Sequence, residues 1–309
     1  MNTRAIADIR LSMQYAADSS EQLLLVARDG RSFVAAALAA QDGRAVPDSV
    51  DALLQSQSPA VDDSVVELWQ RIDAAGYDGP GRVEMPRHAP LLHRPGKIVC
   101  VGQNFRRHAE EMGAPLPRWP VLFSKFNNAL SAPDGVVKLP PPEVAVKYDY
   151  ETELVVVIGR EIGAAQAGDG DVMACVAGYC IGHDLTARDL QKERGGQWLL
   201  GKTLDGFAPI GPDFVGAGLA GDSSAMAIET RLNGQVVQSS STADFIFPVE
   251  AVLRYVARHF PLQPGDVVFT GTPEGVIAGK PVADQRWLRP GDQLESRVGQ
   301  LGTLRFRLA

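Results

Sequence analysis

The sequence predicts an α+β, mainly β protein, in which a mixed or rolled β-sheet carries peripheral helices and follows a small N-terminal α/β domain. From residue 97 onward, short apolar runs alternate with turns bounded by glycine and proline, and helical patterns are few. Strands and helices do not alternate regularly, which argues against a doubly wound parallel sheet. The predicted division is an accessory domain over 1–80, a Pro/Gly-rich linker over 81–96 and a large domain over 97–309.

The composition indicates a globular chain. It has 309 residues, of which 45% are hydrophobic and 22% charged, and this excludes a disordered protein. A net charge of −7 argues against a nucleic-acid partner, because no basic stripe is present to neutralise phosphates. No apolar run is long enough to span a bilayer, and the first ten residues contain no signal core. We therefore expect no membrane partner and a cytoplasmic location, with the three cysteines as buried free thiols.

The first 80 residues carry no candidate catalytic chemistry. Residues 23–27 and 32–38 predict two strands joined by a hairpin-type turn over 28–31. Helices are expected over 49–54 and 62–75, where apolar residues recur at helical spacing.

The larger part of the chain is dominated by strands. Helices are predicted over 106–112, 185–191 and 248–259. Eight strands are predicted, over 98–101, 121–125, 154–158, 176–181, 227–232, 266–270, 293–298 and 303–308.

Two acidic residues within one predicted strand, 148–159, are the strongest candidate for chemistry. Glu151 and Glu153 are two apart, so their side chains point to the same face of a strand. Like charges at this distance repel, and a divalent cation held by carboxylate oxygens would compensate them. The alternative is an exposed acidic edge strand paired with arginines.

A third carboxylate, Asp184, is expected where a strand ends and the predicted helix over 185–191 begins. A helix-capping role is the structural alternative for it. On the new helix, Arg188 and Gln191 are three apart and share a face. Three carboxylates suggest a magnesium ion that takes further ligands from a chelating anionic substrate, whose carboxylate Arg188 would bind.

The segment 101–113 offers a candidate general base. His108 and Glu111 lie at i and i+3 of a short predicted helix, so the carboxylate can orient the imidazole. Gly102 and Gly113 flank the segment and could act as hinges of a lid. A chance pair on a surface helix is the alternative interpretation.

Two further segments contain single polar residues of interest. Lys202 follows an apolar run and could stabilise an enolate, although a surface lysine would look the same. Thr272 lies in a glycine-rich turn, 270–276, whose backbone amides and hydroxyl could bind an anion.

Taken together and in this order, these stretches resemble the fumarylacetoacetate hydrolase family, and the chain looks most like its acylpyruvase-type branch. Asn104 stands near the place where the name-giving animal enzymes have a fourth metal-site carboxylate. The resemblance implies a rolled mixed-sheet catalytic domain, a homodimer and a divalent metal, usually Mg²⁺, with Mn²⁺ or Ca²⁺ possible. The matching stretches are 101–111, 149–159, 178–191, 196–212, 269–276 and 288–292.

The resemblance also implies roles for individual residues. Glu151, Glu153 and Asp184 look like the metal ligands, and His108 with Glu111 looks like the pair that activates water. The residues that look like substrate-holding or enolate-stabilising groups are Arg188, Gln191, Lys202 and Thr272.

The expected activity is metal-dependent hydrolysis of a carbon–carbon bond in a β-diketo acid of the acylpyruvate or fumarylpyruvate type. The alternative within the family is a decarboxylase, isomerase or lyase that acts on a related 2-oxo or 2-hydroxydienoate acid, such as oxaloacetate. These reactions need the same metal and enolate but no attacking water. A more distant alternative is a non-catalytic module with a structural ion, although the spacing does not suit an EF-hand.

Overall fold

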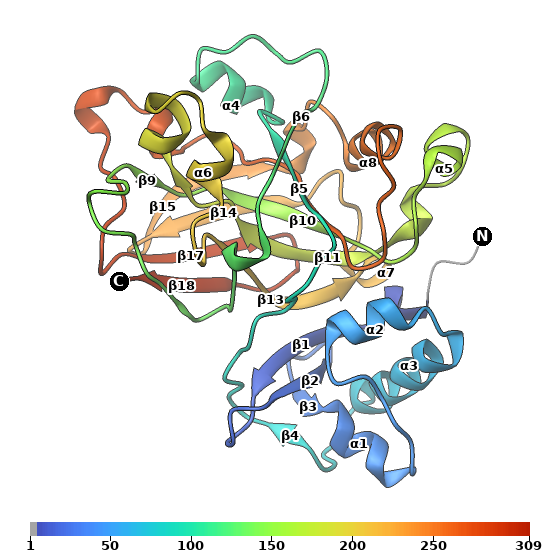
Figure 1. Cartoon of the computed structure of the whole chain (residues 1–309). Helices are drawn as coiled ribbons and strands as arrows, with labels where there is room; N and C mark the ends of the chain where they lie inside the picture. Colours follow the sequence, from blue (N-terminus) through green and yellow to red (C-terminus); the bar gives the residue numbers. More distant parts are fainter. Residues whose placement is uncertain (1–4) are drawn as a thin grey trace.

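The computed structural model describes residues 5–309, so residues 1–4 of the predicted accessory domain lie outside the described residues. A large mixed β-sheet runs through the molecule, with two smaller sheets and several helices around it (Figure 1). The predicted fold class, a rolled mixed sheet with peripheral helices, is confirmed. The described residues contain no helix that is long and apolar enough to cross a membrane.

The large sheet has eleven strands, ordered β4-β3-β2-β1-β13-β11-β10-β16-β5-β6, with β7 paired to β13. Its pairs are antiparallel except β16–β5 and β13–β7, which are parallel. Its strands are β1 (Arg10–Tyr15), β2 (Glu21–Val26), β3 (Ser32–Val34), β4 (Arg82–Val83), β5 (Ile98–Gly102), β6 (Val121–Ser124), β7 (Leu130–Ser131), β10 (Thr152–Ile158), β11 (Val176–His183), β13 (Ala208–Gly216) and β16 (Val267–Phe269).

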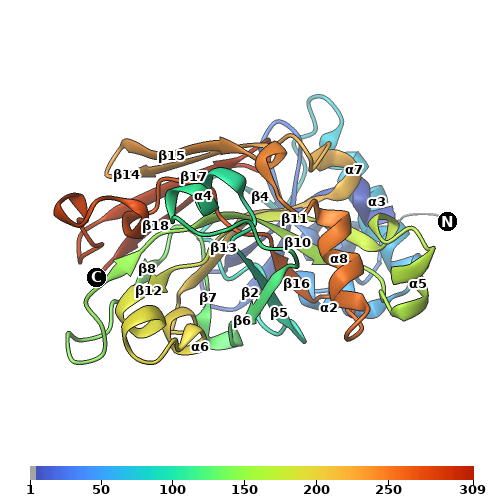
Figure 2. The ribbon, with the colours of Figure 1, turned by 90° about the horizontal axis from the view of Figure 1, so that it is seen from above.

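Two smaller sheets complete the β structure. One has five strands in the order β15-β14-β17-β18-β8, and the other pairs only β12 with β9. Figure 2, seen from above, shows β14, β15 and β17 lying beside one another along one side of the molecule. These strands are β8 (Val136–Val137), β9 (Tyr148–Asp149), β12 (Thr186–Ala187), β14 (Ala227–Leu232), β15 (Gln235–Ser241), β17 (Gln293–Val298) and β18 (Leu304–Leu308).

The helices are short and peripheral. Helix α8 lies beside α5, and α1 to α3 pack around the N-terminal strands (Figures 1 and 2). Their bounds are α1 (Ala35–Gln41), α2 (Val50–Ser56), α3 (Pro59–Asp73), α4 (Arg106–Glu111), α5 (Ala164–Gly168), α6 (Trp198–Lys202), α7 (Ala217–Ala220) and α8 (Val249–Ala257).

The N-terminal strands extend the large sheet, because β1 pairs antiparallel with β13. The structure corrects one prediction in this region. The expected strand over 32–38 stops at Val34, and Ala35 begins helix α1. Five of the first six residues of this helix are alanine, and alanine is the best helix former.

Two other differences concern the larger part of the chain. The predicted helix over 185–191 does not form; β12 and a π-helical turn over Asp189–Glu193 take its place. The long central strand β13 was not predicted, because Pro209, Gly211 and Pro212 interrupt its apolar pattern.

Strand β10 is buried on both faces, which explains its uninterrupted apolar run. Leu154 and Val156 belong to one hydrophobic cluster, whereas Val155 and Val157 belong to the cluster on the opposite face. The three cysteines are free and buried, as predicted.

Candidate active site

Four segments converge at one end of the strands in the large sheet. Strands β16 and β5 run parallel, so the loops that follow them leave the sheet at the same end. Strand β10 runs antiparallel to β16 and to β11, so the start of β10 and the end of β11 lie at this end too. The topology therefore brings together segments that are far apart in the sequence.

The three predicted metal ligands lie together at this end of the strands. Glu151 immediately precedes β10, Glu153 lies within it, and Asp184 immediately follows β11. The backbone N–H of Asp184 donates to the carbonyl oxygen of Glu151 at 2.9 Å, which fixes the two residues side by side. All three side chains are buried, and one carboxylate oxygen from each lies within 4.8 Å of the others.

Two lysines compensate part of this negative charge. Lys202 Nζ donates to Glu151 Oε2 at 2.7 Å and to Asp184 Oδ2 at 2.5 Å. Lys125, which was not predicted, donates from Nζ to Asp184 Oδ1 at 2.6 Å. Burial lowers the pKa of Lys202, but Asp184 and Glu151 outweigh it, so the pKa is raised and the ammonium stays charged. Its place at the end of the predicted strand 121–125 was the only signal for Lys125.

Glu151 and Glu153 differ in their electrostatic environment. Burial acts to raise the pKa of Glu151, but Lys202 and Arg188 outweigh it and lower the value to about 2. Burial, then repulsion from Asp184 and Glu151, raises the pKa of Glu153 well above its ordinary range. Among the described residues, no cationic side chain forms an ion pair with Glu153, and its Oε2 accepts a hydrogen bond from the Gly271 N–H at 2.7 Å. Clustered hard oxygen donors with one uncompensated carboxylate fit a divalent cation.

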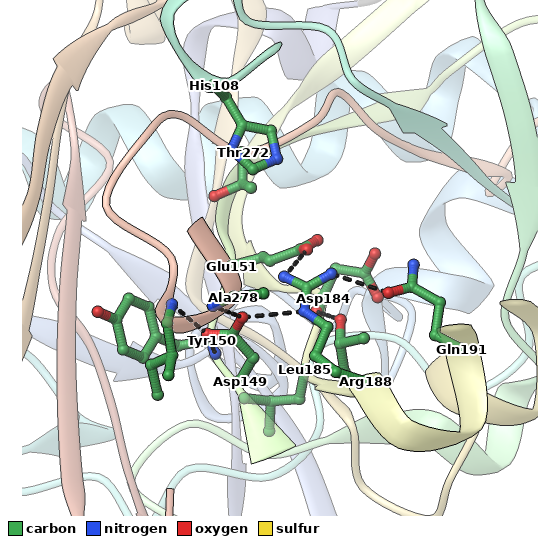
Figure 3. A network of polar contacts seen from close by, with 12 residues as sticks. His108, Asp149, Tyr150, Glu151, Asp184, Leu185, Arg188, Gln191, Thr272 and Ala278 are labelled. Atoms are coloured by element: carbon green, nitrogen blue, oxygen red, sulfur yellow. Dashed lines mark hydrogen bonds and ion pairs between the residues drawn. The ribbon is translucent and has the colours of Figure 1, made fainter. Parts of the chain in front are cut away.

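Asp149, another residue that the sequence analysis missed, anchors Arg188. The Arg188 guanidinium donates to Asp149 Oδ2 at 2.9 Å, to Gln191 Oε1 at 2.9 Å and to Glu151 Oε1 at 2.6 Å (Figure 3). Asp149 also accepts hydrogen bonds from the backbone N–H groups of Ile277 and Ala278. Arg188 is therefore held in place by the protein's own carboxylates in this structure, and its predicted role toward substrate stays a prediction.

His108 and Thr272 line the same cavity as Glu151 and Glu153, and Figure 3 draws both of them above Glu151. His108 Nδ1 is 3.3 Å from Glu111 Oε2, as the i, i+3 spacing predicts. The backbone N–H of Gly275 donates to both Glu111 oxygens, at 3.0 and 3.2 Å. A carboxylate anchored by the neighbouring loop thus holds the imidazole by one nitrogen and leaves the other available.

Thr272 and Asn104 form hydrogen bonds that hold the segments around the site in place. The Thr272 hydroxyl donates to the Thr152 carbonyl at 3.0 Å and accepts a hydrogen bond from Gln238 Nε2 at 3.0 Å. The buried Asn104 amide donates to the carbonyls of Phe247 and Thr270, so it ties two loops together.

A cavity of about 70 Å³ opens between these groups. Polar residues and an apolar wall share its surface. Its lining includes His108, Glu151, Glu153, Arg188, Gln191, Lys192, Lys202 and Thr272, together with Val101, Met112, Phe123 and Trp198. Seven of the nine predicted site residues therefore line one cavity, and the other two, Glu111 and Asp184, bond to the lining residues His108 and Lys202.

A small cavity lined by buried carboxylates, cations and an oriented imidazole is typical of an enzyme active site. The family model described as fumarylacetoacetate (FAA) hydrolase, C-terminal, matches residues 97–309. The chain therefore belongs to the fumarylacetoacetate hydrolase family.

Three similar proteins indicate the range of this family. Oxaloacetate tautomerase FAHD2A, mitochondrial, of Homo sapiens is 41% identical over 78% of this chain and 75% of its own. The structure of fumarylacetoacetate hydrolase from psychrophilic Exiguobacterium antarcticum is 28% identical, with a TM-score of 0.78 over 97% of this chain and 99% of that one. The 2-hydroxyhepta-2,4-diene-1,7-dioate isomerase of Mycobacterium marinum is 25% identical, with a TM-score of 0.67 over 98% of each chain.

Proposed function

We propose that this protein is a keto–enol tautomerase of a short 2-oxo acid such as oxaloacetate. The observation that carries the proposal is the cavity in which a buried carboxylate cluster faces His108. The tautomerase name of the human relative and the isomerase title of the Mycobacterium marinum structure support it. These relatives favour the isomerase alternative of the sequence analysis over the carbon–carbon hydrolase that we expected first.

Glu151, Glu153 and Asp184 are the proposed ligands of a divalent cation. Magnesium is the expected ion, and manganese or calcium suits the same oxygen donors. When bound, such an ion would act as a Lewis acid that favours the enolate form of a 2-oxo acid.

The chain's own residues would carry the proton transfer. Tautomerisation removes the proton from the enol oxygen and adds one to the neighbouring carbon, so it needs a group that both accepts and donates. His108 is the proposed group, because Glu111 holds Nδ1 and leaves Nε2 for the cavity. Lys202 remains charged and would stabilise negative charge on the enolate oxygen rather than act as a base.

The cavity also bears on how the reaction would be kept from solvent. Its apolar wall, which includes Phe123 and Trp198, would exclude water from the enolate.

The decisive assay follows the relaxation of freshly dissolved enol oxaloacetate to its keto form. We expect the protein to accelerate loss of enol absorbance, and chelator to abolish the acceleration. Pyruvate release, measured in the same samples, separates tautomerisation from decarboxylation. Relaxation at the uncatalysed rate, with magnesium present, would contradict the proposal.

Hydrolysis of an acylpyruvate is the second candidate, and the His108–Glu111 pair is the observation that favours it. Chelator-sensitive cleavage of acetylpyruvate or fumarylpyruvate would support this candidate. If magnesium binds but none of these substrates reacts, the substrate should be sought among 2-hydroxydienoates and sugar-derived 2-oxo acids.

We also propose a homodimer, which the family resemblance implies and which sedimentation would test. The cytoplasmic location stays a prediction, since the name of the human relative places that protein in mitochondria.

A further inference from the structure

The cations that line the cavity differ in how far the protein already uses them. Lys202 bonds to two carboxylates, Glu151 and Asp184. Arg188 donates to Asp149, Glu151 and Gln191. The positive charges of Lys202 and Arg188 are therefore largely compensated by carboxylates of the protein.

Lys192 is the exception. It lies in the π-helical turn Asp189–Glu193, directly after Gln191, and its side chain lines the cavity while remaining exposed. Among the described residues, Lys192 forms no ion pair, although its neighbour Glu193 pairs with Lys147. Partial burial, followed by repulsion from Arg188, lowers the pKa of Lys192, as expected of an ammonium without a carboxylate partner.

We propose that Lys192 is a specificity-determining residue that binds the second carboxylate of a dicarboxylic 2-oxo acid. The exposed Lys192 ammonium, which has no ion-pair partner among the described residues, attracts an anionic group. The proposed metal site, whose ligands Glu151 and Glu153 line the same cavity, would bind the 2-oxo carboxylate. The inference rests on the proposed function for the position of that first carboxylate.

The chemical consequence is a preference for four-carbon dicarboxylates over monocarboxylic acids. A substrate with carboxylates at both ends places negative charge at Lys192, whereas a monocarboxylic acid such as acetylpyruvate places an uncharged group there. Because the ammonium is partly exposed, the preference should be modest and should weaken at high salt.

Equilibrium binding of two unreactive 2-hydroxy acids tests the proposal without requiring turnover. L-malate is L-lactate with one further carboxylate, so the ratio of their dissociation constants isolates the second carboxylate. The full-length protein, loaded with magnesium, would be titrated calorimetrically with each acid. We expect wild-type protein to bind malate more tightly than lactate. We further expect Lys192→Met to weaken malate binding roughly fivefold and to leave lactate binding unchanged.

Two variants complete the design. Lys192→Arg keeps the charge and should retain most of the malate preference. Lys138→Met removes an exposed lysine outside the cavity lining and should change neither affinity. The proposal is overturned if wild-type protein binds malate no better than lactate, or if Lys192→Met weakens both acids equally or neither.

The outcome is separable from the proposed function. A protein whose malate preference is lost in Lys192→Met, but which does not accelerate enol relaxation, would uphold the Lys192 subsite and remove the tautomerase activity. A tautomerase in which Lys192→Met leaves the malate preference intact would keep the activity and remove the subsite.

Discussion

Lys125 Nζ lies 2.6 Å from Asp184 Oδ1, and both side chains are closed off from solvent. Lys202 bonds to the other Asp184 oxygen, so two ammonium groups hold one carboxylate. Lys125 also donates to the Leu185 carbonyl at 3.3 Å, which fixes the chain just after β11. Asp184 is therefore positioned by the protein itself, independently of any ligand.

Removal of Lys125 should destabilise the fold. Lys125→Met leaves a buried carboxylate with one partner fewer, and breaking a buried ion pair in this way costs about 3–5 kcal/mol. Urea unfolding of the metal-free protein would measure the loss, with Lys138→Met as the control for removing an exposed lysine. An unfolding free energy equal to that of the control would show that the pair contributes nothing.

Loss of the His108 imidazole should slow catalysis without weakening magnesium binding. We expect His108→Asn to lower kcat for enol relaxation by about two to four orders of magnitude, because general acid–base catalysis contributes that much. Magnesium affinity should stay unchanged, since no carboxylate of the cluster is altered. A variant that keeps kcat within tenfold would exclude His108 as the proton carrier.

Gly271 should tolerate no side chain. Its φ of +95° is unfavourable for other residues, and an added Cβ would lie 2.9 Å from Asn104 Cβ and 3.0 Å from the Val101 carbonyl oxygen. Gly271→Ala should lower both stability and magnesium affinity, because the Gly271 N–H orients Glu153. Gly234 has a similar φ of +82° with open space around it, so Gly234→Ala controls for the backbone cost. Equal effects of the two substitutions would refute the contact-based explanation.

Asp213 should make stability fall as the pH rises. Burial raises its pKa from 3.8 to about 6, against the opposing effects of Arg10 and Ser12. Between these values the folded protein holds a proton that the unfolded chain has released, so raising the pH lowers the unfolding free energy by up to roughly 3 kcal/mol. Urea unfolding at about pH 4 and about pH 7 would compare wild type with Asp213→Asn. The Asn variant should lose this component of the pH dependence, and an unchanged difference would contradict the assignment.

The sequence predicted the carboxylate cluster because short-range rules define it. Glu151 and Glu153 are two residues apart, and Asp184 follows an apolar run that is typical of a strand. The antiparallel pairing of β10 with β11 then brings the three together. His108 and Glu111 were likewise predictable, since both lie within one helical turn.

Other features depend on long-range topology that no local pattern encodes. In the sequence, Asp149 lies in the same predicted strand as Glu151. Its role as the anchor of Arg188 depends on hydrogen bonds from the amides of Ile277 and Ala278, more than 120 residues away in the sequence. Strand β13 was hidden by its prolines and glycine, and yet it joins the N-terminal strands to the large sheet. The predicted helix at 185–191 failed because β12 pairs with β9, a tertiary contact that overrides local propensity.

The most direct test of the central claim measures enol relaxation and magnesium binding together in wild type and Glu153→Gln. The claim predicts that chelator reduces the wild-type rate to that of buffer and that magnesium restores it. It also predicts that Glu153→Gln folds, binds magnesium much more weakly and does not accelerate relaxation. A wild-type rate that chelator leaves unchanged, or a Glu153→Gln variant with wild-type kcat/KM, would contradict a metal-assisted tautomerase at this carboxylate cluster.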